Sequence, residues 1–131
     1  MRLLACLVCV VGASLAPLAV RAGDFDGSKP FICAAVEALD CGAGEACAKG
    51  TPDDIGAPAF MRIDVARKAV IGPKRTSAIH YVDRSESQLL LQGTELGYGW
   101  TIVVDQASGK MAVSLVNLDG VFVLFGSCIL P

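Results

Sequence analysis

The chain has 131 residues, of which 53% are hydrophobic and 18% charged, and its formal net charge is −2. This length fits one small domain rather than several. The slight acidic excess argues against nucleic-acid binding, because proteins with that function usually carry a basic surplus on one face.

Residues 1–22 have the features of a cleavable export signal. Arg2 gives a positive start, and the apolar run that follows, residues 3–20, is interrupted by Gly, Ser and Pro before a small residue, Ala22. A retained membrane anchor is the alternative, since the run is nearly long enough to cross a bilayer. The interruptions and the small residue favour removal. We therefore expect cleavage after Ala22, a periplasmic or secreted location, and one small globular domain over residues 23–131.

The part of the chain after the signal keeps four of the six cysteines, which are Cys33, Cys41, Cys47 and Cys128. An even number in a small exported domain indicates two disulfides. Zinc is the alternative, but no Cys-x-x-Cys pair exists and the single histidine is distant in sequence, so we expect no metal and no cofactor. Loss of two arginines with the signal leaves nine basic and thirteen acidic residues, a net charge of −4.

The first predicted element is a helix. Residues 23–29 are polar and suit a loose lead-in, after which Ser28 can cap a helix that has Pro30 in its first turn. Apolar residues then follow at helical spacing and would give the helix one buried stripe: Ile32, Ala35, Val36 and Leu39. Residues 40–57, rich in Gly, Asp and Pro, are expected to form a loop that a local disulfide can close.

From residue 59 onward the pattern changes to strands joined by short turns. Residues 60–65 alternate, residues 69–71 make a short return, and residues 76–83 and 87–93 form a candidate hairpin. A second hairpin has its loop at residues 106–109. Its register puts six apolar residues on one face in three cross-strand pairs: Val104–Met111, Ile102–Val113 and Trp100–Leu115.

These elements predict an α+β fold, in which one N-terminal helix packs on a curved antiparallel β-meander of about five to seven strands. Disulfides are expected to cross-link this fold. A turn at Asp119-Gly120 would place Cys128 on the same apolar face as Trp100, which is the face that the helix must cover. Cys33 lies on that helix, too far from Cys41 to bond at a rise of about 1.5 Å per residue. We therefore expect the disulfides Cys33–Cys128 and Cys41–Cys47.

The opposite face of the predicted sheet is also partly apolar. It carries Val103, Val116, Val123 and Phe125. A curved or partly closed sheet that buries both sides would explain these residues. The alternative is an exposed apolar strip that binds a ligand or a partner.

His80 is the only histidine, so a general base must be this residue or a carboxylate. On the predicted hairpin it shares a face with Val82, Leu89 and Leu91, where a packed histidine is the commoner outcome. Catalysis would require a nearby carboxylate such as Asp64 or Asp83.

Three other features suggest sites only weakly. Asp53-Asp54 lacks the spacing of a calcium loop and suits a cap or turn, while Gly97-Tyr98-Gly99 lacks the following helix of a phosphate-binding loop. A group of basic residues is compatible with an anion-binding edge, although solvated turns and edge strands explain it as well: Arg62, Arg67, Lys68, Lys74 and Arg75.

Several segments resemble a group of small exported proteobacterial proteins of unknown function. These are residues 56–64, the Leu91-Gln-Gly93 segment, Gly99-Trp100 with residues 108–111, and the ending Phe122-Val-Leu-Phe-Gly-Ser-Cys128. The resemblance implies bacterial origin and export, and it implies no catalytic residue.

Two functions follow from the sequence. The first is a non-enzymatic exported module that binds an unknown protein or a small ligand through its sheet, with neither nucleic acid nor a membrane span after removal of the signal. The second is a small hydrolase-type enzyme that uses His80 with a nearby carboxylate.

Overall fold

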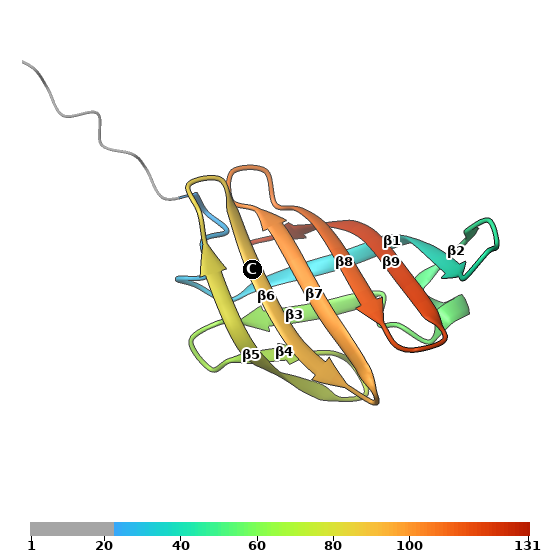
Figure 1. The fold of residues 1–131 in the computed structure, drawn as a ribbon. Helices are drawn as coiled ribbons and strands as arrows, with labels where there is room; N and C mark the ends of the chain where they lie inside the picture. Colours follow the sequence, from blue (N-terminus) through green and yellow to red (C-terminus); the bar gives the residue numbers. More distant parts are fainter. Residues whose placement is uncertain (1–22) are drawn as a thin grey trace, which may run out of the picture.

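A computed structural model of the chain describes residues 23–131. The predicted export signal, residues 1–22, lies outside this range. Within it there are nine β-strands and one 3-10 turn (Figure 1). In chain order they are β1 (Phe31–Gly42), β2 (Ala48–Gly50), η1 (Pro52–Ile55), β3 (Phe60–Asp64), β4 (Ala69–Ile71), β5 (Thr76–Arg84), β6 (Gln88–Glu95), β7 (Tyr98–Asp105), β8 (Lys110–Val116) and β9 (Gly120–Ile129).

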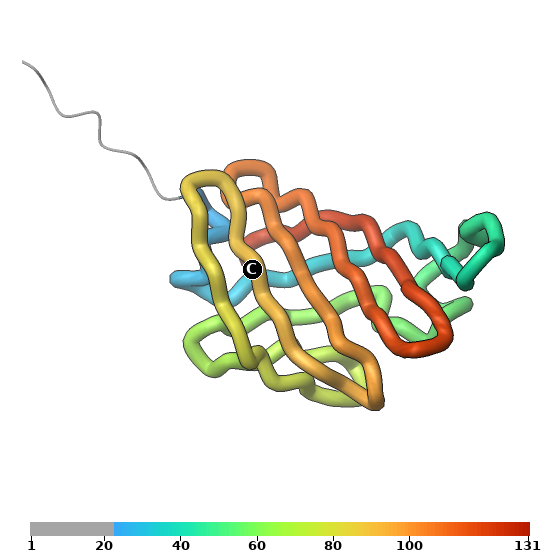
Figure 2. The backbone as a smooth tube through the Cα atoms, in the orientation of Figure 1, coloured from blue at the N-terminus to red at the C-terminus, as the bar shows by residue number. Residues whose placement is uncertain are grey.

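The strands form one antiparallel sheet that closes on itself. The strands β3 to β9 pair in chain order, and β1 pairs with β3 along one edge and with β9 along the other. Among the described residues, β1 and β3–β9 therefore make a closed eight-stranded antiparallel barrel. The short β2 pairs beside the second half of β1. The first strand, in cyan, and the last, in red, run next to each other in Figure 1 and Figure 2.

The predicted N-terminal helix is wrong, and with it the α+β fold class. Residues 31–42 form the long strand β1, in which Phe31, Cys33 and Ala35 point into the barrel and are buried. The apolar positions fitted a helical period because residues 31–36 are apolar without a break, and such a run satisfies a period of 3.6 as well as a period of 2. Pairing with β9, near the other end of the sequence, selects the strand.

The hairpin of β7 and β8 has the predicted register, which pairs Trp100 with Leu115 and Val104 with Met111. The predicted turn at Asp119-Gly120 would pair Leu115 with Leu124. The hairpin is shifted by two residues from this register, so that Leu115 faces Phe122. The Asn117 side chain causes the shift, because its Oδ1 accepts hydrogen bonds from the backbone N of residues 119 and 120 and moves the turn toward the N-terminus. A shift of two residues leaves every side chain on its expected face.

The core fills the inside of the barrel with apolar side chains. The most deeply buried are Phe31, Ile63, Leu89, Leu91, Leu124, Val104 and Cys33. Trp100 lies across Gly93 on the neighbouring strand, and its Nε1 donates a hydrogen bond to Ser77 Oγ at 2.9 Å. A Cβ atom at Gly93 would overlap both the indole ring and the backbone oxygen of Ala78. The absence of a side chain at Gly93 therefore makes room for the only tryptophan.

Residues 23–29 are not the loose lead-in that the sequence predicted, because they pack across one end of the barrel. Phe25 is buried edge-to-face against Phe31, with ring centroids 5.7 Å apart. Its backbone N donates a hydrogen bond to the backbone oxygen of Gln106 at 3.2 Å. The backbone oxygen of Asp26 accepts a hydrogen bond from Arg84 Nε at 2.9 Å. This segment seals the end at which β1 begins.

Both disulfides have the predicted partners, Cys33–Cys128 and Cys41–Cys47. The predicted reason for the first was wrong. Cys33 does not reach the sheet from a helix. It lies on β1 directly opposite Cys128 on β9, so the bond links the two strands whose pairing closes the barrel. The second bond closes the hairpin between β1 and β2.

The two disulfides should contribute unequally to stability. Their bonded cysteines are 95 and 6 residues apart in sequence. Loop-closure entropy then predicts a loss of about 5 kcal/mol on removal of Cys33–Cys128 and about 2 kcal/mol on removal of Cys41–Cys47. Chemical denaturation of the paired Cys→Ala variants measures both losses without leaving an unpaired thiol. Equal losses would contradict the loop-length argument.

Replacement of Gly93 should disturb the core around Trp100. We expect Gly93→Ala to lower the free energy of unfolding by about 1–3 kcal/mol, because the new methyl group overlaps the indole ring and a backbone oxygen. Gly99→Ala is the matched control on the adjacent strand, since nothing lies within 4 Å of its Cβ position, and it should change stability by less than about 0.5 kcal/mol. Thermal and urea denaturation with tryptophan fluorescence report both effects. A Gly93→Ala variant as stable as the control would refute this account of the glycine.

Candidate functional site

The four residues of the predicted partner surface all lie on the outside of the barrel. Val103 and Val123 are half-buried, whereas Val116 is 45% and Phe125 42% exposed. The alternative of a sheet buried on both sides does not apply to this face, because the closed barrel turns it outward and no other element among residues 23–131 covers it.

The apolar surface is larger than the sequence predicted, because β1 adds to it. We call it the outer seam, and it comprises the outward apolar residues of β1 and β9 with their neighbours on β7, β8 and β3: Ile32, Ala34, Val36, Leu39, Val121, Val123, Phe125, Ile129, Val103, Ala112, Val116 and Phe60. Val36 is 71% exposed and Phe60 65%. The residues on β1 were missed because that segment was interpreted as a helix. An unbroken apolar run is also the signal of a strand that is covered on both faces.

A β-bulge shapes the middle of the outer seam. The β1–β9 register slips between Ala35 and Glu37, which leaves Val36 as the extra residue and turns its side chain outward. Gly126 lies opposite the bulge, where a Cβ atom would collide with the backbone oxygen of Ala34. The bulge and the glycine together let the two strands approach closely and bend.

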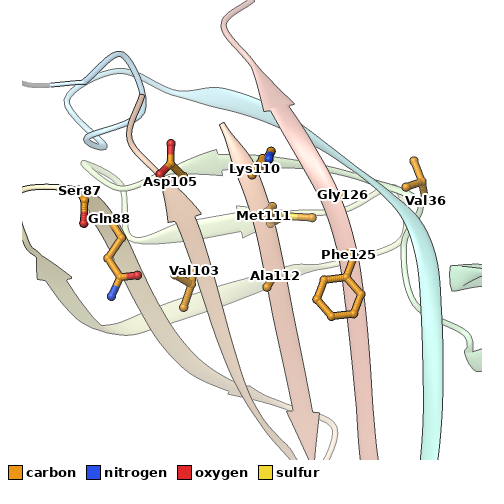
Figure 3. Close-up of a pocket in the computed structure, with 10 residues that line it drawn as sticks. All are labelled: Val36, Ser87, Gln88, Val103, Asp105, Lys110, Met111, Ala112, Phe125 and Gly126. Atoms are coloured by element: carbon orange, nitrogen blue, oxygen red, sulfur yellow. The ribbon is translucent and has the colours of Figure 1, made fainter. Parts of the chain in front are cut away.

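A shallow, open groove of about 530 Å³ runs along this surface beside β8. Figure 3 shows Val103, Ala112 and Phe125 side by side on three adjacent strands, with Val36 beyond them on β1. The small residues Ala112 and Gly126 form the floor of the groove, while Phe125 and Val36 rise beside it. The groove is thus apolar in the part beside β9, with an aromatic ring at its side, and polar at its other end.

The polar end of the groove carries Asp105 and Lys110. The Asp105 carboxylate accepts hydrogen bonds from the backbone N and the Oγ of Ser108, both at 2.7 Å, and from the Ala107 backbone N at 3.2 Å. The Ser108 bonds, with a smaller contribution from Lys110, lower the pKa of Asp105. This carboxylate is therefore ionised at neutral pH and engaged in its own turn, which makes it unsuited to accept a proton from a substrate.

His80 is exposed at a bulge in β5, so its predicted place beside Val82, Leu89 and Leu91 is wrong. The register slips between Ile79 and Tyr81, and the two leucines point into the barrel.

Among residues 23–131, no hydrogen bond or ion pair joins His80 to Asp64 or Asp83. Asp64 is buried and accepts a hydrogen bond from the backbone N of Arg67 at 3.1 Å. The described structure thus assembles no catalytic pair at this histidine.

The weaker candidates have structural roles. Asp54 caps η1 by accepting from the backbone N of Thr51 at 2.7 Å and from its hydroxyl at 2.8 Å. Gly97 has a positive φ in the turn before β7, and Tyr98 packs near Phe122 at 5.9 Å between ring centroids.

The basic residues are spread over β3 and the turns on either side of β4, and two of them pair with carboxylates. Arg67 lies 3.7 Å from Asp64 and Arg75 lies 3.8 Å from Glu95. Within the described part of the chain, no cluster of His, Cys, Asp and Glu side chains is arranged to hold a metal ion. Residues 23–131 contain no helix with the length and apolarity needed to cross a membrane.

Comparisons with protein-family models, curated proteins and solved structures find no match to this chain. The role of the outer seam must therefore be inferred from its own shape and chemistry.

The titration of Asp105 can be tested directly. Its pKa should lie below the usual 3.8, and Ser108→Ala should raise it toward that value by removing one charge-assisted hydrogen bond. Because the folded pKa is depressed, the stabilisation is present above the unfolded pKa of about 3.9 and is lost as the pH falls through the folded pKa. NMR titration of the carboxyl carbons measures the shift. Asp54, whose pKa is lowered by Thr51, serves as the internal control and should not change.

Proposed function

We propose that this protein is an exported, non-enzymatic interaction module that binds a protein partner through the outer seam. The observation that carries the proposal is the apolar character of both faces of β1 and β9. Their inward side chains fill the barrel, and their outward ones, such as Val36 and Phe125, are left uncovered within the described residues. Strands with this pattern are usually covered on both sides.

The size of the outer seam favours a protein over a small molecule. Four strands spaced about 4.8 Å apart and ten residues of β9 that rise about 3.3 Å each give a face of about 600 Å². Patches of this size on a monomer are commonly functional. Small-molecule sites instead enclose most of their ligand, and the groove beside β8 is shallow and open.

Two disulfides are consistent with an oxidising, extracellular type of compartment. Together with the signal features of residues 1–22, they support the proposal that the protein acts in the periplasm or outside the cell.

Site-specific photocrosslinking tests the proposal in cells that export the full chain. We expect benzoylphenylalanine at position 125 to form discrete adducts with a protein, because this side chain lies in the middle of the outer seam. Position 81 on β5 is the matched control, since Tyr81 is also an exposed aromatic residue, at 53%, but lies away from the seam. Adducts at position 125 should disappear when Val36→Asp is added. Similar adducts at both positions, or none at position 125, would refute the proposal.

A further inference from the structure

We infer that the partner of the outer seam is a second copy of this chain, bound as a symmetric face-to-face dimer. The inference rests on the proposed function and names its partner. It follows from the shape of the face, its charges and its area.

The groove and its neighbouring ring are complementary to each other. Across three adjacent strands the outward side chains run in the order Val103 on β7, Ala112 on β8 and Phe125 on β9. On β1 the bulge comes next, with Glu37 directly opposite Phe125 and Val36 as the extra residue beside it. Ala112 and Phe125 are direct cross-strand partners. A projecting ring and a small-residue hollow therefore lie one strand apart on the same row of the sheet, as Figure 3 shows.

A single two-fold axis brings the ring of each copy onto the hollow of the other. An axis parallel to the strands and between β8 and β9 places Phe125 of each copy over Ala112 of the other. The same rotation places the β1 bulge, which carries Val36 and Glu37, over Val103 of the other copy. Two sheets packed in this way keep their strands within about 30° of each other, as aligned sheet packing requires. A symmetric dimer needs one patch to be complementary to itself, and the neighbouring ring of Phe125 and hollow at Ala112 meet that requirement.

The acidic groups on the outer seam and at its polar end are paired within each copy. Glu37, which lies opposite Phe125, forms an ion pair with Lys49 on β2, and Asp105 is attracted by the neighbouring Lys110. Each acidic group thus has a basic neighbour on its own copy, and two copies meet with little net charge at the contact.

The area of the face also fits this partner. About 600 Å² of projected surface, estimated from strand spacing, is the most that this convex face can bury, and it is less than the roughly 800 Å² that each partner buries in a standard protein interface. A dimer of modest affinity is therefore expected rather than an obligate one.

Sedimentation velocity of the exported, processed protein over a range of concentrations tests the dimer. We expect concentration-dependent dimerisation, and we expect Phe125→Ala to raise the dissociation constant at least about thirtyfold, because the ring is lost twice per dimer. Tyr81→Ala is the matched control and should leave the dissociation constant unchanged. Circular dichroism confirms that each variant is folded.

A swap of the two side chains makes the test specific to the inferred geometry. Ala112→Phe alone should prevent dimerisation, because it brings two aromatic rings together. The double variant Ala112→Phe, Phe125→Ala should restore dimerisation, since ring and hollow exchange strands while the axis stays the same. Failure of the double variant to recover affinity over both single variants would overturn the inferred arrangement.

The outcomes for the partner and for the proposed function can be told apart. Protein that stays monomeric at about 100 µM, well above a dissociation constant of about 1 µM, overturns the dimer. If position 125 still forms adducts with a different protein, the proposed function stands and only the second copy is excluded. A monomer without any adduct at position 125 excludes both.

Discussion

The antiparallel pairing of β1 with β9 is the interaction on which the rest of the structure depends. It extends from Ile32 to Gly42 along β1, joins the first long strand to the last, and carries the Cys33–Cys128 bond in its register. Without it the meander of β3 to β9 would be an open sheet with an uncovered apolar face. The bulge that lets these strands bend also turns Val36 outward, so closure of the barrel and the shape of its outer surface have one cause.

The local parts of the fold were predictable from the sequence, and the closure was not. The hairpin from Trp100 to Leu115 has strict alternation and a glycine-containing loop, which are both local signals, and its register is the predicted one. Residues 31–36 carry no such signal, because an unbroken apolar run fits a helix and a strand equally well. Only the pairing with residues about ninety positions later decides between them, and contacts at that separation leave no trace in local periodicity.

In the candidate site, the residues on regular strands were predictable from the sequence and the residues at bulges were not. The outward positions of Val103 and Phe125 follow from alternation along regular strands, whereas the contribution of Val36 depends on a bulge. The same kind of irregularity misplaced His80, since one extra residue in β5 changes the face of every side chain beyond it. Alternation therefore located the apolar surface on β7, β8 and β9 and failed where a strand departs from regular pairing.

The distance in sequence between β1 and β9 also sets the order of folding. The partner of β1 is synthesised after all the other described strands, so no native barrel can form before residues 120–129 have left the ribosome, and loop closure over such a separation is slow. The export that we propose requires an unfolded chain at the membrane, and this delay suits it. On that proposed route Cys33 would reach the oxidising side as a free thiol long before its partner Cys128, whereas Cys41 and Cys47, six residues apart, could join as soon as both had arrived.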